Sequence, residues 1–405
     1  MTRTIFRNAN LLDGENAARP GTTVIIEGDR IQAVGAGAPE NPTDTIVDLD
    51  GMTLMPGMVS GHYHAAYSGS GDQALATDTP QTQQAFWALG NVQTALRNGY
   101  TSVVGAGTYF DIDARLAEAL DAGVVTGARL IPSSRALAPS VVGGGRAEDS
   151  PYPTYVGPEA YRKATLVEIE NGARVVKIFA ASGHALLGTR DMTEEEITAA
   201  VNAAHENGAR VRAHVAGRDA VLRCARLGVD IIDHADWADD ACIEAFLEHD
   251  CFVLPSLYMG YLSAKDPTVP GAELYVAEDF EYMRGMLPKM ADAGVKLVPG
   301  DDYGFGALVH GDYSRELACY VDAVGIDPIE VIKWATKNGG ELTGVADLGT
   351  IAPGMIADIV VVDGDPSKDI NMLCDADRIV AVIKAGETVH GTLPVIPYRA
   401  AAMTS

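Results

Sequence analysis

The strongest constraint on the fold is a regular alternation of apolar runs and helix-like stretches through the middle of the chain. Apolar runs typical of buried β-strands occur at 53–60, 101–106, 128–132, 174–180, 209–215, 229–233, 251–257 and 295–299. Helix-like stretches lie between them, among them 193–207, 219–227, 239–248 and 281–293. Gly208, Gly228 and Gly294 stand where three of these helices should end. Eight such units predict an α/β fold, a (β/α)₈ TIM barrel over residues 53–345.

The two ends of the chain have a different pattern. Residues 1–52 contain short β segments, including two strands expected on either side of Gly28-Asp29. Near the other end, 357–363 and 379–386 are apolar strand patterns with a turn-rich connection. We therefore expect residues 1–52 and 346–405 to form one small β-sandwich domain together.

Composition restricts the partners and the location. The 405 residues are 47% hydrophobic and 21% charged, which is enough for a barrel and a smaller domain. The net charge of −25 argues against nucleic acid and anionic membranes, and no apolar run approaches the ~20 residues that span a bilayer. The five cysteines are scattered without a C-x-x-C pair, which is typical of reduced thiols. We expect a cytoplasmic homo-oligomer that acts on a small molecule.

Two histidines follow the first apolar run, in the order Gly61-His62-Tyr63-His64. Residues two apart on a strand point to the same side, so His62 and His64 can offer two imidazoles to one metal ion. Taken alone, the pair fits equally well a strand with two polar residues on a wet face. Active sites of barrels lie at the carboxyl ends of the strands, so a metal site predicts further ligands at the ends of later runs.

Later runs do carry residues of the required types. The fifth run ends at His214, the sixth ends at His234, and the eighth is followed by Asp301 and Asp302. Lys177 lies inside the fourth run, where a charged and unpaired amine is costly. It either reaches solvent, pairs with a carboxylate, or is carboxylated by CO₂ to an anionic carbamate that can bridge two cations.

Six side chains are therefore expected at one face of the barrel: His62, His64, Lys177, His214, His234 and Asp302. Nitrogen and oxygen ligands without thiolate suit Zn²⁺, with Mn²⁺, Co²⁺ or Fe²⁺ as alternatives. Asp302 is preferred over Asp301, because alternation along the strand points the two carboxylates in opposite directions. A carboxylate in this position can bind metal and accept a proton from the attacking water.

Several motifs together carry a family resemblance. They are P-G-M-V-S-G-H-Y-H at 56–64, V-V-K-I-F-A-A-S-G at 175–183, R-A-H at 212–214, D-H at 233–234, G-D-D at 300–302 and G-T-I-A-P-G-M-I-A-D-I-V-V-V-D at 349–363. In this combination the chain resembles the amidohydrolase superfamily over nearly its whole length. The K-I-F-A-A-S-G form is similar to the imidazolonepropionase-like and Xaa-Pro dipeptidase-like branch. The superfamily usually shows Gly-Thr-Asp at the eighth strand, which also matches Asp302.

The resemblance implies a centre of two divalent metal ions and an activity. His62, His64 and Asp302 would hold one metal, His214 and His234 would hold the other, and carboxylated Lys177 would bridge them. The implied reaction is hydrolysis of a C–N bond in an amide, N-acyl amino acid, carbamate or urea. A hydroxide that bridges the two metals would attack the carbonyl, and Asp302 would pass its proton to the leaving amine.

Departures from the dipeptidase-like relatives bear on the substrate. Those relatives commonly carry Gly-Gly-His after the third strand, whereas residues 143–146 here read Gly-Gly-Gly-Arg. They also tend to show Glu-His-Gly at the sixth strand, where this chain has Asp-His-Ala at 233–235. The absent histidine leaves space, which favours a bulkier and less charged acyl or aryl group over an Xaa-Pro dipeptide. Arg146 either binds a substrate carboxylate or pairs with Glu148 or Asp149.

Other candidate substrate residues follow the fourth, seventh and eighth runs. Tyr258 and Tyr261 either donate a hydrogen bond to a substrate carbonyl or pack over the barrel mouth. His184, Tyr303 and His310 are further candidates for the pocket.

Three alternatives to this function remain. The first is an Xaa-Pro-type dipeptidase or carboxypeptidase of the same superfamily. The second is a mononuclear deaminase, which usually carries a glutamate two or three residues after the fifth-strand histidine; residues 215–218 here read Val-Ala-Gly-Arg, and Lys177 would have no role. The third is a non-catalytic assembly protein, which should lack several ligands that this chain retains.

Overall fold

The computed structural model describes residues 3–35, 41–67, 79–139, 153–181, 190–272 and 277–397. The chain divides into two compact units. The first comprises Met1–Val59, Leu96–Thr101 and Asp327–Ser405, and the second comprises Ser60–Ala95 and Ser102–Ile326. Among the helices in the described ranges, none is long and apolar enough to cross a membrane.

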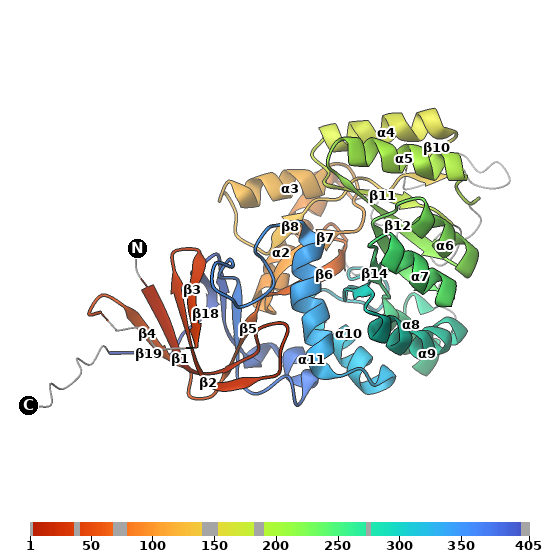
Figure 1. Ribbon diagram of the computed structural model, residues 1–405. Coiled ribbons are helices and arrows are strands. Elements are labelled where there is room, and N and C mark those ends of the chain that lie inside the picture. Colours follow the sequence, from red (N-terminus) through yellow and green to blue (C-terminus); the bar gives the residue numbers. More distant parts are fainter. Residues whose placement is uncertain are drawn as a thin grey trace, which may run out of the picture. The chain divides into compact units, whose positions relative to one another are not determined.

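The first unit is built on a mixed β-sheet that joins both ends of the chain (Figure 1). Its strands are β1 Arg3–Leu11, β2 Arg19–Glu27, β3 Arg30–Gly35, β4 Thr45–Asp48, β5 Thr53–Pro56, β16 Ile359–Val362, β17 Ile379–Lys384, β18 Glu387–Gly391 and β19 Val395–Ile396. They follow the order β18-β17-β16-β5-β1-β2-β3, while β4 pairs with β1 and β19. Strands β2 and β3 pair across Gly28-Asp29, which confirms the predicted hairpin.

The pairing of β5 with β16 holds the two ends of the chain together. All four residues of β16 are buried, as expected for a strand covered on both faces. The core around it consists of Phe6, Ala9, Leu11, Val24, Ile26, Ile31, Val47, Leu49, Leu54, Ile351, Ala357, Ile359, Val361, Ala381 and Ile383. Helices α11 Pro328–Lys333 and α12 Gly339–Thr343 also belong to this unit, joined by a π-helical segment at Trp334–Asn338.

The first apolar run is not one strand, as the sequence pattern predicted, but two. Residues Thr53–Pro56 form β5 in the sheet of the first unit, and β6 spans Met58–Tyr63 in a different sheet. The break falls at Gly57, where an added Cβ would lie 2.1 Å from Oγ1 of Thr101, so only glycine fits. Every residue of both strands is buried, which explains why the sequence pattern shows no break between them.

The second unit contains two parallel sheets whose strands alternate with helices (Figure 1). One sheet has the order β6-β7-β8 and the other the order β11-β12-β13-β14-β15. The strands after β6 are β7 Tyr100–Gly105, β8 Arg129–Ile131, β11 Val175–Phe179, β12 Arg210–Ala216, β13 Ile231–Asp236, β14 Phe252–Leu254 and β15 Lys296–Leu297. A short pair, β9 Ala138–Pro139 and β10 Thr154–Tyr155, lies beside them. The α/β class predicted from the alternation is confirmed.

Helices follow the strands in the predicted order. They are α2 Gln81–Arg97, α3 Ile112–Asp121, α4 Pro158–Glu170, α5 Glu194–Glu206, α6 Arg218–Arg226, α7 Asp240–Glu248, α8 Leu257–Lys265, α9 Ala277–Ala293 and α10 Ser314–Cys319. Thr193 caps α5 through a capping box with Glu196. Gly208, Gly228 and Gly294 follow α5, α6 and α9 with positive φ, which is the expected role of glycine after a helix.

Isolated parallel bridges link the edges of the two sheets. Ser133, which follows β8, pairs with Val175 at the start of β11, and Tyr63 in β6 pairs with Tyr303 beyond β15. In addition, the N–H of Gly61 donates to the carbonyl of Pro299 at 2.8 Å. These contacts align the carboxyl ends of β6 and β15, from which several of the candidate ligands extend.

Candidate metal centre

His62, His64 and Asp302 converge at the carboxyl ends of β6 and β15. Nε2 of His62 lies 2.7 Å from Oδ1 of Asp302, and Nε2 of His64 lies 3.2 Å from the same oxygen. Both histidines are buried, whereas the side chain of Asp302 is 16% exposed. One carboxylate oxygen therefore faces two imidazole nitrogens, and the side chain of Asp302 keeps some contact with solvent.

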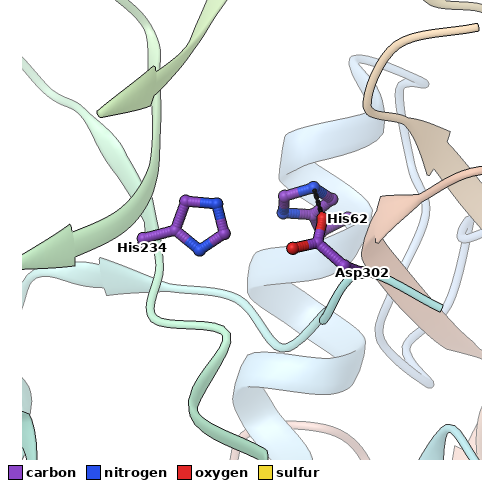
Figure 2. A group of neighbouring side chains, drawn as sticks. All are labelled: His62, His234 and Asp302. Atoms are coloured by element: carbon purple, nitrogen blue, oxygen red, sulfur yellow. Dashed lines mark ion pairs between the residues drawn. The ribbon is translucent and has the colours of Figure 1, made fainter. Parts of the chain in front are cut away.

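Two further histidines come from the neighbouring strands β12 and β13. Nε2 of His234 lies 3.1 Å from Nδ1 of His214. His62, His234 and Asp302 each offer a ligand atom within 4.8 Å of the others, and Figure 2 shows them around a common space. His234 and Ala235 have φ of +67° and +57°, a left-handed conformation that alanine in particular rarely adopts. Such strain clusters at functional sites, where the surrounding structure holds it in place.

Lys177 is buried in β11 and is paired with a carboxylate. Its Nζ lies 2.5 Å from Oδ2 of Asp233, and Arg212 donates to both oxygens of Asp233 at 2.8–3.1 Å. Arg212 also donates to the carbonyls of Gly61 at 2.8 Å and Gly105 at 2.7 Å. Lys177 is 1% exposed, so the prediction that its amine reaches solvent is wrong. The alternative that it pairs with a carboxylate is observed.

The protonation states of the site residues favour the binding of a cation. Burial lowers the pKa of the His62 imidazole, so the ring is uncharged at neutral pH. Burial alone would raise the pKa of the Asp302 carboxyl, but the neighbouring His62 and His64 rings hold that pKa well below its usual range. Nδ1 of His64 lies 3.0 Å from the carbonyl of Gly107, so Nδ1 carries a proton and Nε2 is the nitrogen that faces Asp302.

The donor set therefore fits a divalent metal ion. Nε2 of His62 is buried and has no hydrogen-bond partner within the described residues, although it lies 2.7 Å from the Asp302 carboxylate. At this distance a ring nitrogen and a carboxylate oxygen need a positive charge between them, which either a proton or a bound metal ion supplies. Neutral imidazoles and a carboxylate are typical ligands of Zn²⁺ and similar ions.

Asp301 points away from the histidines, as alternation along the chain predicted. Its carboxylate accepts hydrogen bonds from the N–H groups of Met259 at 2.9 Å and Asp302 at 2.8 Å. Burial and the adjacent Asp302 raise the pKa of Asp301 to about 7. The Asp301 side chain thus stabilises the turn that contains Asp302.

The other predicted pocket residues have mixed outcomes. Tyr261 lies on α8, accepts a hydrogen bond from Lys265, and packs on Phe280 with ring centres 5.6 Å apart, which favours its packing alternative. Tyr258 stacks on Tyr261 at 6.3 Å. His310 has Nδ1 3.0 Å from the hydroxyl of Tyr313 and packs against Tyr63. Arg146 and His184 lie outside the described residues, so their roles stay predictions.

The sequence patterns did not predict the partner of Lys177. A signal was present, because Arg212 precedes His214 by two residues on the same strand and so faces the same side. An arginine in that position inside an apolar, buried strand requires a buried carboxylate partner, and Asp233 on the adjacent strand was available.

An aromatic wall beside the histidines was also missed. His64 stacks on Tyr67 with ring centres 4.2 Å apart, and Tyr67 stacks on Tyr109 at 5.3 Å. The wall forms one buried cluster of Tyr67, Tyr109, Ala136, Ala138, Phe179 and Phe305. Phe179 also packs on His214 at 5.1 Å, so this cluster lies next to both pairs of histidines.

Comparison with known proteins decides the family. Residues 53–389 match the amidohydrolase family. The chain belongs to the amidohydrolase family. An ochratoxinase from Aspergillus niger is 27% identical over 389 residues, with coverage of 84% of this amidohydrolase and 76% of the relative. An imidazolonepropionase from Nocardia farcinica is 24% identical over 372 residues, with 87% of each chain covered.

A solved structure extends the comparison to three dimensions. A prolidase complexed with N-methylphosphonate-L-proline is 30% identical and superposes with a TM-score of 0.86 over 96% of this amidohydrolase and 100% of that chain. Together with the site, these similarities make the amidohydrolase a metal-dependent hydrolase that acts on a C–N bond of a small molecule.

Proposed function

We propose that this amidohydrolase uses two divalent metal ions, with zinc as the expected ion. His62, His64 and Asp302 would hold one ion, and His214 and His234 would hold the other. The observation that carries the proposal is the convergence of buried imidazole nitrogens on one carboxylate oxygen, at 2.7 and 3.2 Å, without hydrogen-bond geometry at His62. When bound, such ions would lower the pKa of water and polarise the substrate carbonyl.

Asp302 would act as the proton carrier. The pKa of its carboxyl is held well below the usual range, so the group is ionised, and its role as proton acceptor would depend on the bound ions making the attacking water acidic. Its 16% exposure exceeds that of the histidines, which gives it access to the leaving amine. Asp301 and the turn around it would keep the carboxylate in place.

Carboxylated Lys177 would bridge the two ions. Burial and the nearby Arg212 lower the pKa of the amine, although Asp233 opposes this shift, so the reactive neutral form is easier to reach. The ammonium loses one proton, the amine nitrogen attacks the carbon of CO₂, and a second proton leaves to give the carbamate. Lys177 must release Asp233 to react, and Arg212 keeps that carboxylate paired when it does so.

We also propose a domain architecture for the chain. The second unit would be a closed eight-stranded barrel, supported by the bridges that link β8 to β11 and β6 to the segment after β15. A β-sandwich would be built from residues 1–52 and 346–405, which β5 and residues 327–343 join in the first unit, and the barrel would lie within residues 53–345. A homo-oligomeric state and a cytoplasmic location remain predictions, which light scattering and cell fractionation can test.

The proposed substrate is an amide, carbamate or urea with an aryl or apolar N-acyl group. The aromatic wall of Tyr67, Tyr109, Phe179 and Phe305 supports this, because it packs beside His64 and His214 and makes the surroundings of the proposed metal site apolar. The similarity to an ochratoxinase is consistent with an aromatic amide substrate.

An Xaa-Pro dipeptidase is the second candidate, because the 30% identical relative is a prolidase that binds a proline derivative. Side-by-side measurement of kcat/KM on aryl or N-acyl amides and on Ala-Pro-type dipeptides distinguishes the two candidates. We expect the amides to be the better substrates. A clear preference for dipeptides that Arg146→Ala abolishes would reverse this ranking and make Arg146 the carboxylate anchor. Release of ammonia from an aminated heterocycle would instead indicate a deaminase.

A further inference from the structure

The ring of His64 is held on two sides by groups outside the candidate metal centre. Its Nδ1 contacts the carbonyl oxygen of Gly107 at 3.0 Å, and its face stacks on Tyr67 with an angle of 6° between the rings. An imidazole that donates from Nδ1 presents the lone pair of Nε2 on its opposite side. The position of the Gly107 carbonyl therefore decides which nitrogen of His64 faces Asp302.

Gly107 is itself fixed by the segment that follows β8. Its N–H donates to Oγ of Ser133 at 2.9 Å, and the N–H of Thr108 donates to the carbonyl of Ser134 at 3.1 Å. Gly107 has a φ of +117°, which only glycine adopts readily. These bonds hold the peptide groups on both sides of Gly107, so its carbonyl has one direction.

A buried carboxylate completes this arrangement. Oγ of Ser133 donates to Oδ2 of Asp113 at 2.9 Å, and the N–H of Ser133 lies 3.3 Å from the same oxygen. Asp113 lies in the first turn of α3 and is fully buried. A hydroxyl has one proton, so donating it to Asp113 leaves the oxygen of Ser133 free to accept from Gly107.

We propose that Asp113 is a positioning residue for His64, acting through Ser133 and Gly107 to fix the imidazole with Nδ1 protonated and Nε2 facing Asp302. The inference rests on the proposed metal site and adds to it a second layer of residues from α3 and the segment after β8. Outer residues that orient a histidine ligand typically change metal affinity by about 10–100-fold when they are replaced.

The test compares four variants of the metal-free protein labelled with ¹⁵N-histidine. Ser133→Ala removes the oxygen, Ser133→Thr retains it, and Asp113→Asn changes the acceptor with little change in shape. Ser102→Ala is the matched control, because Ser102 is also a buried serine in this region and its oxygen accepts from Arg129 instead. Side-chain ¹⁵N shifts report the tautomer of His64, and a titration with Co²⁺ alone reports metal affinity.

We expect the wild type, Ser133→Thr and Ser102→Ala to show His64 with Nδ1 protonated. Ser133→Ala and Asp113→Asn should show a mixture of tautomers and at least tenfold weaker Co²⁺ binding. An unchanged tautomer and affinity in the variants that fold would overturn the proposal, as would an equal loss in Ser102→Ala. If the wild type failed to bind Co²⁺, the metal site would be wrong, and the ¹⁵N shifts alone would decide the role of Asp113.

Discussion

Replacing Arg212 with methionine tests whether one buried guanidinium holds the strand ends that carry the histidines. Arg212 is fully buried and donates to the carbonyls of Gly61 in β6 and Gly105 in β7, as well as to Asp233 in β13. Methionine fills similar space but offers no donor. The substitution therefore isolates the hydrogen bonds from the packing.

The expected loss follows from the groups left without a donor. Two buried carbonyls lose their partner, and an unsatisfied buried polar group costs ~1–3 kcal/mol. Asp233 keeps Lys177, so no unpaired charge is added. We expect Arg212→Met to lower the free energy of unfolding by ~4 kcal/mol, a large share of the ~5–15 kcal/mol that stabilises a domain.

Urea unfolding of the metal-free protein measures this loss. With a slope of ~3 kcal/mol/M, the transition midpoint should fall by roughly 1 M or more. Arg218→Met is the matched control, because Arg218 also pairs with two carboxylates but is largely exposed, and its loss should leave the midpoint nearly unchanged. A midpoint for Arg212→Met equal to that of Arg218→Met would refute the reasoning.

Three further predictions follow from the site. Asp302→Asn should reduce kcat by at least ~10²-fold with a smaller effect on KM, and Asp301→Asn should be milder; an inactive Asp301→Asn beside an active Asp302→Asn would contradict the proton carrier. Lys177→Ala should lose bound metal and activity together, measured by elemental analysis, with partial rescue of both by short carboxylic acids; full metal content would contradict the bridge. Burial raises the pKa of Asp113 to about 6, so this group opposes folding as pH rises from about 4 to 6. Over that range the stability of the metal-free wild type should fall relative to Asp113→Asn by up to ~3 kcal/mol, and parallel stability curves would contradict the shift.

Much of the site was predictable because strand ends follow from local patterns. A histidine that ends an apolar run, such as His214 or His234, lies toward the carboxyl end of a parallel strand whatever the details of packing. The choice of Asp302 over Asp301 needed only the alternation of side chains along an extended chain. These inferences depend on the alternation of side chains along a strand and on the order of the apolar runs, both of which can be read from a single sequence.

Other features depend on pairing between distant segments. The division of residues 53–60 into two strands follows from the pairing of β5 with β16, about 300 residues away, which no local pattern reveals. The partner of Lys177 likewise depended on which carboxylate the neighbouring strands bring to it. For Tyr261 the sequence allowed both a substrate contact and packing, and its contact with Phe280 became visible only once α8 and α9 were in place.

The most direct test of the central claim is a crystal structure of the protein loaded with zinc and bicarbonate, with anomalous scattering recorded at the zinc edge. We predict two zinc peaks in each chain, one beside His62, His64 and Asp302 and one beside His214 and His234. Additional density on Nζ of Lys177 should lie between them. A single zinc peak, with unmodified Lys177 still paired to Asp233, would contradict the two-metal mechanism.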